Sequence, residues 1–259
     1  MTTPGIEFSL AERRVLVTGG SSGIGRAIAI GCAAAGAQVA LSYRANEAGA
    51  ASTAEAIRAL GARAHVLRAD IAQPREIEAL ARSATTALGR VDVWINNAGA
   101  DILTGAGAQL SQAEKLDRLL TVDLRGTVLA SWAAVEVMQR QETGGLILNM
   151  AWDHVVGGAT KGEYAPLFCA AKGGVYSFSK ALARAVAPRV RVNVLGPGWV
   201  ETAWGADLDP EAKSRITDAI PLKRWGVPDD VASAAVFLAS DAATYITGQM
   251  LMINGGDVI

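Results

Sequence analysis

The sequence predicts an α/β fold, in which one doubly wound parallel sheet of about seven strands carries helices on both faces. Short β-rich runs alternate with helical stretches along the whole chain, and short loops join them. Hydrophobic residues make up 51% of the 259 residues, and 28 are glycines, which suits a large buried sheet with tight turns. No change in composition and no Pro/Ser-rich linker divides the chain, so we expect residues 1–259 to form a single domain.

In the first half of the chain, strands and helices alternate regularly. The expected strands are short β-rich runs at 14–18, 38–43, 64–68 and 91–95. The expected helices lie at 25–35, 48–60 and 75–88. The first follows a glycine-rich turn, and Gly61 and Gly89 end the other two.

The second half of the chain continues this alternation. The expected strands are 145–150, 190–195 and 249–253. The expected helices are 116–140, 170–187 and 228–239, and Pro188 ends the second of them. Because connections between parallel strands are right-handed, these helices should stack on both faces of the sheet.

Charge and cysteine content exclude several classes of function. A formal net charge of −1 and the lack of long like-charge runs argue against a nucleic-acid or membrane-surface partner. Only Cys32 and Cys169 occur, so we expect no disulfide framework and no metal-ligand cluster. Residues 1–10 do not resemble a signal peptide, and no apolar stretch approaches the roughly 20 residues that span a bilayer. We therefore expect a cytoplasmic protein.

A glycine-rich turn from Thr18 to Gly25 joins the first strand to the first helix. Glycines allow the backbone to approach a pyrophosphate closely, and the helix N-terminus offers free N–H groups and a positive dipole end. An ordinary turn is the alternative, but the strand before it and the helix after it favour a Rossmann-type dinucleotide site. The expected cofactor-binding residues here are Gly19, Ser21, Ser22, Gly23, Ile24 and Gly25.

The end of the second strand bears on the choice between NAD and NADP. An NAD site usually places Asp or Glu there to bind the ribose 2′-hydroxyl, whereas an arginine accommodates the 2′-phosphate of NADP. This chain has Ser42-Tyr43-Arg44 and no acid. Arg44 is either a solvated surface residue or a phosphate ligand, and the missing acid favours NADP(H) as the cofactor.

Further motifs follow the other strands, and together they identify a family. Ala69-Asp70-Ile71, Asn96-Asn97-Ala98-Gly99 and the segment from Pro197 to Thr202 follow strands three, four and six. With the glycine-rich turn, they resemble the classical short-chain dehydrogenase/reductase family over essentially the whole chain. Segments 221–226, 237–240 and 246–256 resemble its 3-oxoacyl-carrier-protein reductase and glucose dehydrogenase branch. The resemblance implies that Asp70, Ile71, Asn97, Ala98, Gly99, Pro197, Gly198, Val200 and Thr202 contact the cofactor.

The resemblance also implies a catalytic tetrad of Asn, Ser, Tyr and Lys, and this chain departs from it at three positions. In the family, the tyrosine is the acid/base, the serine holds the substrate carbonyl, and the lysine tunes the tyrosine and binds the cofactor ribose. The matching positions here are Asp123, Trp152, Phe168 and Lys172, so that only the lysine remains. No serine lies between Asn149 and Phe168, so sliding the alignment does not restore one.

Three side chains are candidates to replace the lost proton donor beside Lys172: Asp153, Tyr164 and Asp123. Tyr164 lies eight residues before Lys172, and enoyl reductases of the family place theirs seven before it; the alternative is a loop residue that covers the substrate cleft. Either aspartate can act as an acid if burial raises its pKa, although Asp153 also suits an Asx turn. The expected substrate-binding residues are Trp152, His154, Phe168 and Trp204.

Two functions therefore follow from the sequence. In the first, the protein is an NADP(H)-dependent oxidoreductase that transfers hydride to or from a small organic C=O, C=N or activated C=C substrate. In the second, it binds NADP(H) without turnover, as a sensor or a scaffold subunit. Residues 203–220 are expected to form a substrate lid. By resemblance we expect a homotetramer assembled through the helices at 116–140 and 170–187 and the last strand; the small residues Ala171, Gly173, Gly174 and Ser177 would allow helices to approach closely.

Overall fold

The computed structural model describes residues 8–158, 162–202, 205 and 208–259. Seven strands form one sheet in the order β3-β2-β1-β4-β5-β6-β7, and all neighbouring strands are parallel. The strands are β1 (Arg14–Val17), β2 (Gln38–Tyr43), β3 (Ala64–Arg68), β4 (Val93–Asn96), β5 (Gly145–Met150), β6 (Val190–Pro197) and β7 (Met250–Ile253). The predicted doubly wound parallel sheet is confirmed.

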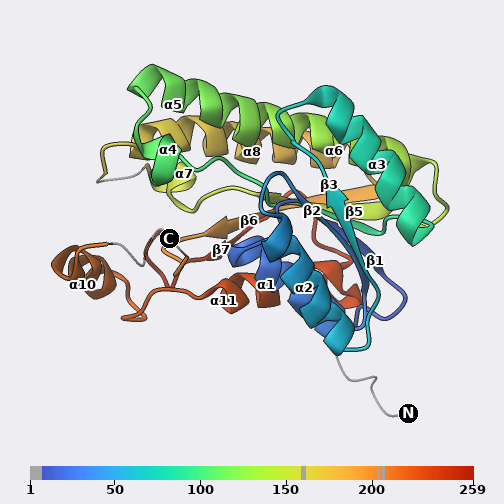
Figure 1. Cartoon of the computed structure of the whole chain (residues 1–259). Coiled ribbons are helices and arrows are strands. Elements are labelled where there is room, and N and C mark those ends of the chain that lie inside the picture. The colour runs from blue at the N-terminus through green and yellow to red at the C-terminus, as the bar shows by residue number, and fades with distance from the viewer. Residues whose placement is uncertain (1–7, 159–161, 203–204, 206–207) are drawn as a thin grey trace, which may run out of the picture.

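Helices cover both faces of the sheet (Figure 1). One layer contains α1 (Gly23–Ala34), α2 (Glu47–Ala59) and α11 (Pro228–Ala239), and the other contains α3 (Pro74–Leu88), α6 (Thr127–Gln139) and α8 (Ala165–Val186). Successive strand residues point to opposite faces, so Val15 and Val17 pack into the first core while Leu16 packs into the second. Both cores consist mainly of buried aliphatic side chains, with Tyr43 in the first and Trp94 in the second.

The strand order reverses between β1 and β4, and this reversal creates the binding crevice. The chain leaves β1 toward one side of the sheet and leaves β4 toward the other, so the loops after these strands diverge. In open α/β sheets, ligands bind at this point, outside the carboxyl ends of the strands. The loops after β5 and β6 extend the same edge.

The expected helix at 116–140 is three consecutive segments in the structure. They are α5 (Gln112–Leu119), the π-helical segment η1 (Leu120–Gly126) and α6. Single π-helical turns are rare and often occur at functional sites, and this one contains Asp123. Helix α8 also differs from the expectation, because it begins at Ala165 rather than at 170, with Pro166 in its first turn.

Among the described residues, four short elements were not expected from the sequence. They are α4 (Gly105–Ala108), α7 (His154–Gly157), α10 (Pro210–Ala219) and the 3₁₀ turn η2 (Asp241–Ala243). Helix α10 lies in the expected lid, where the Asp209 side chain caps its first turn by accepting from the Ala212 N–H. Trp204 lies outside the described residues. Among those described, no helix is both long and apolar enough to cross a membrane.

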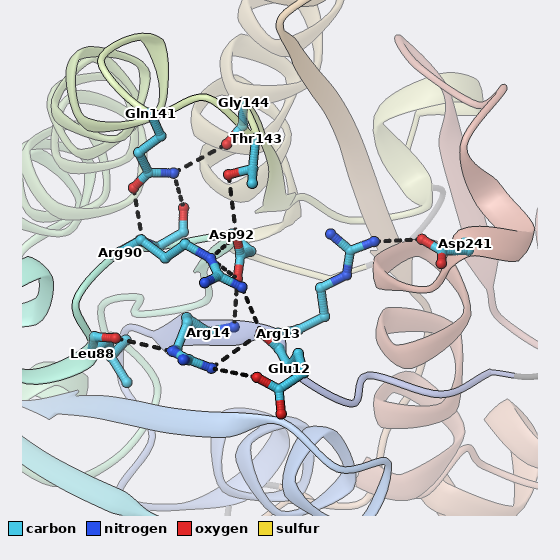
Figure 2. A network of polar contacts seen from close by, with 11 residues as sticks. Glu12, Arg13, Arg14, Leu88, Arg90, Asp92, Gln141, Thr143, Gly144 and Asp241 are labelled. Carbon is cyan, nitrogen blue, oxygen red and sulfur yellow. Dashed lines mark hydrogen bonds and ion pairs between the residues drawn. The ribbon is translucent and has the colours of Figure 1, made fainter.

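A network of polar contacts lies at the amino ends of β1 and β4 (Figure 2). The buried carboxylate of Asp92 accepts from the Arg14 backbone N–H at 2.8 Å and pairs with Arg90 at 2.8 Å. Gln141 bonds the backbone of Val91 on the same side. Because Asp92 is fully partnered and at the opposite edge from the crevice, the cluster holds β1, β4 and the loop before β5 together and is not a candidate site.

Candidate active site

Most of the residues expected to bind a dinucleotide line one cleft of about 550 Å³ at the carboxyl ends of β1, β2 and β4. We call it the dinucleotide cleft. The expected residues that line it are Gly19, Ser21, Ser22, Gly23, Ile24, Gly25, Arg44, Asp70, Ile71, Asn97, Ala98, Gly99 and Thr202. Pro197 is the last residue of β6 and does not line the cleft, while Gly198, Val200 and Lys172 line a second cavity described below.

Two glycines are required where the glycine-rich turn meets β4. Gly19 has φ +68°, and a Cβ there would lie 2.9 Å from the Ala98 backbone; a Cβ at Gly25 would lie 2.2 Å from the Gly19 carbonyl oxygen. The Asn97 side chain bridges the same turn by donating to the Thr18 carbonyl at 2.9 Å. At Ser22, the N-cap of α1, no side chain caps the helix, so its first N–H groups can receive a pyrophosphate.

Arg44 is exposed at the end of β2 and lines the cleft beside Ser42 and Asn46. The carboxylates that line the same cleft, Asp70 and Asp101, come from the loops after β3 and β4 rather than from the end of β2. The place where an NAD site usually holds its acid therefore presents a guanidinium, whose planar donors suit a phosphate.

A second cavity of about 400 Å³ adjoins the cleft, and the described residues that line it include four with aromatic rings: Trp152, Tyr164, Phe168 and Trp199. We call it the aromatic cavity. Its other lining residues are Ile24, Leu103, Ala151, Gly162, Glu163, Ala165, Lys172, Gly198, Val200 and Thr202. Ile24 and Thr202 line both spaces, so the cavity opens where the dinucleotide cleft ends.

A buried ion pair joins Asp123 to Lys172 beside the aromatic cavity. Lys172 Nζ lies 2.9 Å from Asp123 Oδ2 and donates to the Met150 carbonyl at 3.3 Å. Asp123 Oδ1 accepts from the Ala100 N–H at 2.8 Å. The two side chains are 3% and 11% exposed, so the pair has little solvent screening, and Asp123 fixes the direction of the lysine. The structure thus brings together two of the residues expected to be catalytic.

Tyr164 is half-buried, lines the cavity, and carries a cation over its ring. Lys115 Nζ lies 3.7 Å from the ring centroid, and the Lys115 side chain is almost completely buried. Lys115 comes from α5, where Ser111 and Glu114 form a capping box that fixes the start of the helix. Sequence reasoning missed Lys115, because a single lysine in a helix carries no signal of burial.

Asp153 and His154 are not among the described residues that line the cavity, although both were expected to face the substrate. The fully buried Asp153 carboxylate accepts from the Asn254 side chain at 3.0 Å and from the His154 N–H at 2.8 Å. Burial raises its pKa, and the hydrogen bond from Asn254 opposes the change. His154 Nε2 lies 3.5 Å from Asp257 Oδ2.

Ligand atoms of Asp153, His154 and Asp257 lie within 4.8 Å of one another, a grouping that could hold a metal ion. The count of cysteines could not reveal it, because the fold brings Asp257 from the far end of the chain. Both oxygens of Asp153 already accept hydrogen bonds, and we assign no metal to the group.

Trp152 and Phe168, which the sequence pattern assigns to the serine and tyrosine positions, both line the aromatic cavity. Their ring centroids are 6.2 Å apart, with an interplanar angle of 68°. Trp199 and Glu163 complete the lining and were missed by sequence reasoning. Trp199 directly follows Pro197-Gly198, and this position within a cofactor-side motif is a sequence signal that could have marked it as a lining residue.

Comparisons with known proteins agree with this geometry. A family model described as enoyl-(acyl carrier protein) reductase matches residues 19–257. The chain is 35% identical to a 3beta-hydroxysteroid dehydrogenase of Eggerthella lenta, over 95% of this chain and 94% of that protein. It is 34% identical to a 3-oxoacyl-(acyl carrier protein) reductase of Staphylococcus aureus, over 94% and 97%. A Burkholderia cenocepacia short-chain dehydrogenase solved with NADP has a TM-score of 0.85 at 32% identity, covering 96% of this chain and 98% of that one.

Proposed function

Because the chain belongs to the short-chain dehydrogenase/reductase family, we propose that it is an NADP(H)-dependent oxidoreductase whose active site works without the usual tyrosine. It transfers hydride to or from a small organic substrate with a C=O, C=N or activated C=C bond. The observation that carries this proposal is the junction of the dinucleotide cleft with the aromatic cavity at Ile24 and Thr202. A cofactor in the cleft would meet a substrate in the cavity at that junction.

The residues of the cleft fit NADP(H). When bound, the nicotinamide supplies the hydride. The uncapped start of α1 would bind the pyrophosphate, Arg44 the 2′-phosphate, and Lys172 the nicotinamide ribose. The ion pair with Asp123 would hold the Lys172 ammonium in place for that contact. The Burkholderia relative was solved with NADP, which supports the same choice of cofactor here.

The choice of NADP(H) is tested by Arg44→Ala. We expect the unmodified protein to bind NADPH more tightly than NADH, and the variant to lose about tenfold in NADPH affinity with little change for NADH, because only NADPH carries the phosphate. Fluorescence titration measures both affinities. Arg82→Ala, which removes an exposed arginine of α3 outside the cleft, is the matched control. Equal affinities for NADPH and NADH in the unmodified protein would overturn the choice.

Where a substrate needs a proton, Tyr164 is the side chain best suited to supply it. Asp123 is held by Lys172, and Asp153 is fully buried and not among the described lining residues, whereas Tyr164 lines the cavity. The Lys115 ammonium over its ring would stabilise the negative charge that the phenol gains as its proton leaves. Lys115 thus acts through Tyr164, as a positioning residue.

The experiment is a panel of carbonyl, imine and enone substrates assayed with NADPH. On any carbonyl substrate that is turned over, Tyr164→Phe should lower kcat about a hundredfold, the loss typical of a general acid, while NADPH affinity stays unchanged. Tyr176→Phe is the matched control, because Lys180 also lies over that ring but the pair is outside the aromatic cavity. Full activity of Tyr164→Phe would exclude the phenol as the proton donor.

The loss of three tetrad residues favours a second candidate, a protein that binds NADP(H) without turnover. Tight NADPH binding together with no hydride transfer on the whole panel would support it. The variant Phe168→Tyr tests whether the active site has only lost its tyrosine or has been rebuilt around other residues. We expect less than a tenfold gain in ketone reduction, because the Trp152 ring occupies the serine position 6.2 Å from the Phe168 ring. A gain of a hundredfold or more would show that the old site needs only its phenol restored.

A further inference from the structure

We propose that the aromatic cavity selects a cationic iminium substrate, which the bound NADPH reduces to an amine. This inference rests on the proposed function and names the substrate class of the same site. Its basis is the reversed polarity of the cavity wall. Where the family's hydroxyl groups would stabilise the negative oxygen formed in carbonyl reduction, this chain presents the aromatic rings of Trp152 and Phe168.

Two rings at this spacing suit a positive charge. Aromatic faces attract a cation that lies within about 6 Å of the ring centroid, and tryptophan does so most strongly. The Trp152 and Phe168 centroids are 6.2 Å apart at an interplanar angle of 68°, so one cation in the cavity can lie within that range of both. Trp199 adds a third ring to the same wall, whereas the Tyr164 ring already carries the Lys115 ammonium 3.7 Å from its centroid. Neither Trp152 nor Phe168 carries a group that can give a proton to a carbonyl oxygen at the reacting end.

The charges around the cavity agree with a cationic ligand. Two charged side chains are among the described residues that line it, Glu163 and Lys172. The Lys172 charge is offset by Asp123 at 2.9 Å. Glu163 is exposed at the rim and forms no ion pair with any other described residue. Among the described residues, Glu163 is therefore the lining carboxylate without a cationic partner, and it is an exposed group of the aromatic cavity.

The chemistry of an iminium matches the missing phenol. Ketone reduction consumes NADPH and a proton, because hydride adds to carbon and the oxygen must then be protonated. An iminium already carries its positive charge on nitrogen. Hydride from NADPH forms the new C–H bond, the C=N π electrons become the nitrogen lone pair, and the products are a neutral amine and NADP⁺. This reaction needs no proton donor, so the missing tyrosine does not slow hydride transfer to an iminium.

The test compares two bicyclic substrates of similar shape with the NADPH-loaded protein. N-methyl dihydroisoquinolinium is a permanent iminium cation, and tetralone is its neutral ketone counterpart. We expect kcat/KM for the iminium to exceed that for tetralone by about tenfold or more, because the aromatic wall attracts the cation and only the ketone depends on a proton from Tyr164. A binding readout accompanies it: quenching of tryptophan fluorescence by phenyltrimethylammonium and by its uncharged isostere tert-butylbenzene. The ammonium should bind at least about tenfold more tightly.

Three variants test whether residues of the aromatic cavity cause the preference for cationic ligands. Glu163→Gln should raise KM for the iminium severalfold more than KM for tetralone, with kcat unchanged, because it removes a binding charge. Trp152→Leu and, separately, Phe168→Leu should narrow the preference for phenyltrimethylammonium by about three- to thirtyfold. Glu142→Gln changes an exposed glutamate of the loop before β5 and should leave every value unchanged.

The failures are distinguishable. If NADPH does not bind, both the proposed function and this inference are wrong. If NADPH binds and tetralone is reduced as well as the iminium, or the two isosteres bind equally, the oxidoreductase stands and the iminium preference is overturned. Selective binding of the ammonium without any reduction of the iminium also overturns it.

Discussion

Asp123 is the residue on which the geometry of the site depends most. One carboxylate oxygen pairs with Lys172 and the other accepts from the Ala100 N–H, so a single side chain joins η1, α8 and the loop after β4. Asparagine, which the family uses at this position, would keep only one full acceptor oxygen. Removing one partner of a buried ion pair leaves the other charge uncompensated, which costs more than the pair contributes.

Asp123→Asn should therefore lower the free energy of unfolding by about 3 kcal/mol, at the low end of the range for such pairs because Lys172 is slightly exposed. Urea unfolding at neutral pH measures the change. Combining it with Lys172→Met should recover part of the loss, because the double variant has no unpaired charge. If the losses from the two single variants simply add, the residues are not coupled and this description of the pair is wrong.

Asp153 gives the fold a distinct pH dependence. Burial holds its pKa above its ordinary value of about 3.9, so the folded state retains the proton longer than the unfolded state does. Its contribution to stability is fully present below that value and is lost as pH rises through the folded pKa. The asparagine of the Asp153→Asn variant cannot ionise. The stability of this variant relative to the unmodified protein, measured as the difference in free energy of unfolding, should therefore increase from about pH 4 toward neutrality.

Urea unfolding across this pH range measures that difference. Asp117→Asn, which removes an exposed carboxylate on α5, is the control, and its curve should run parallel to that of the unmodified protein. A difference for Asp153→Asn that stays constant with pH would contradict a raised pKa.

At the scale of elements, the π-helical segment η1 connects the cofactor and substrate spaces. Its last residue, Gly126, packs against the loop after β3: a Cβ there would lie 2.8 Å from the Ile71 carbonyl oxygen. Ile71 lines the dinucleotide cleft, and Asp123 of the same segment holds Lys172. The position of this single turn therefore affects both sites.

Gly126→Ala should push η1 away from Ile71, lower the free energy of unfolding by about 1–3 kcal/mol through overpacking, and weaken NADPH binding. Urea unfolding and fluorescence titration measure the two effects. Gly31→Ala in α1 is the matched control, because its Cβ would meet Ala232 Cβ at 3.4 Å, an ordinary contact. Equal stability of the two variants would show that η1 can move without cost.

At the scale of the whole molecule, the outer face of α6 and α8 is the surface that suits assembly. Trp132 of α6 is 55% exposed and packs edge-on against Phe178 of α8, with ring centroids 6.4 Å apart. The small residues expected to favour close helix approach are divided: Ala171 is buried, and a Cβ at Gly174 would meet Leu124 inside the subunit. Gly173 and Ser177 are the two of these residues that remain accessible on α8.

We propose that the protein is a homotetramer that uses this face, as the family commonly does. Light scattering at micromolar concentration should give the tetramer mass, and Trp132→Glu should give a smaller species, because it places a charge in an apolar interface. Leu60→Glu changes a similarly exposed apolar residue at the end of α2, away from this face, and should leave the mass unchanged. A monomer in the unmodified protein would refute the assembly.

The sequence by itself determined the alternation of strands and helices, and it placed β2, β3, β5 and α11 at their observed bounds. These features depend on local patterns: apolar runs, glycine and proline punctuation, and the strand–turn–helix setting of the glycine-rich motif. The same locality allowed the dinucleotide cleft to be predicted, because its residues directly follow the strands that carry them.

Only the tertiary structure decided the composition of the aromatic cavity and the state of its charged groups. Asp123 meets Lys172 across two elements, Lys115 covers Tyr164 from α5, and Asn254 donates a hydrogen bond to Asp153. A local pattern gives the face on which a side chain lies but not its partner from another part of the chain. A carboxylate can act as a proton donor, as the partner in an ion pair or as a structural hydrogen-bond acceptor. Its burial and its partners decide between these roles, and both arise only when the sheet is assembled.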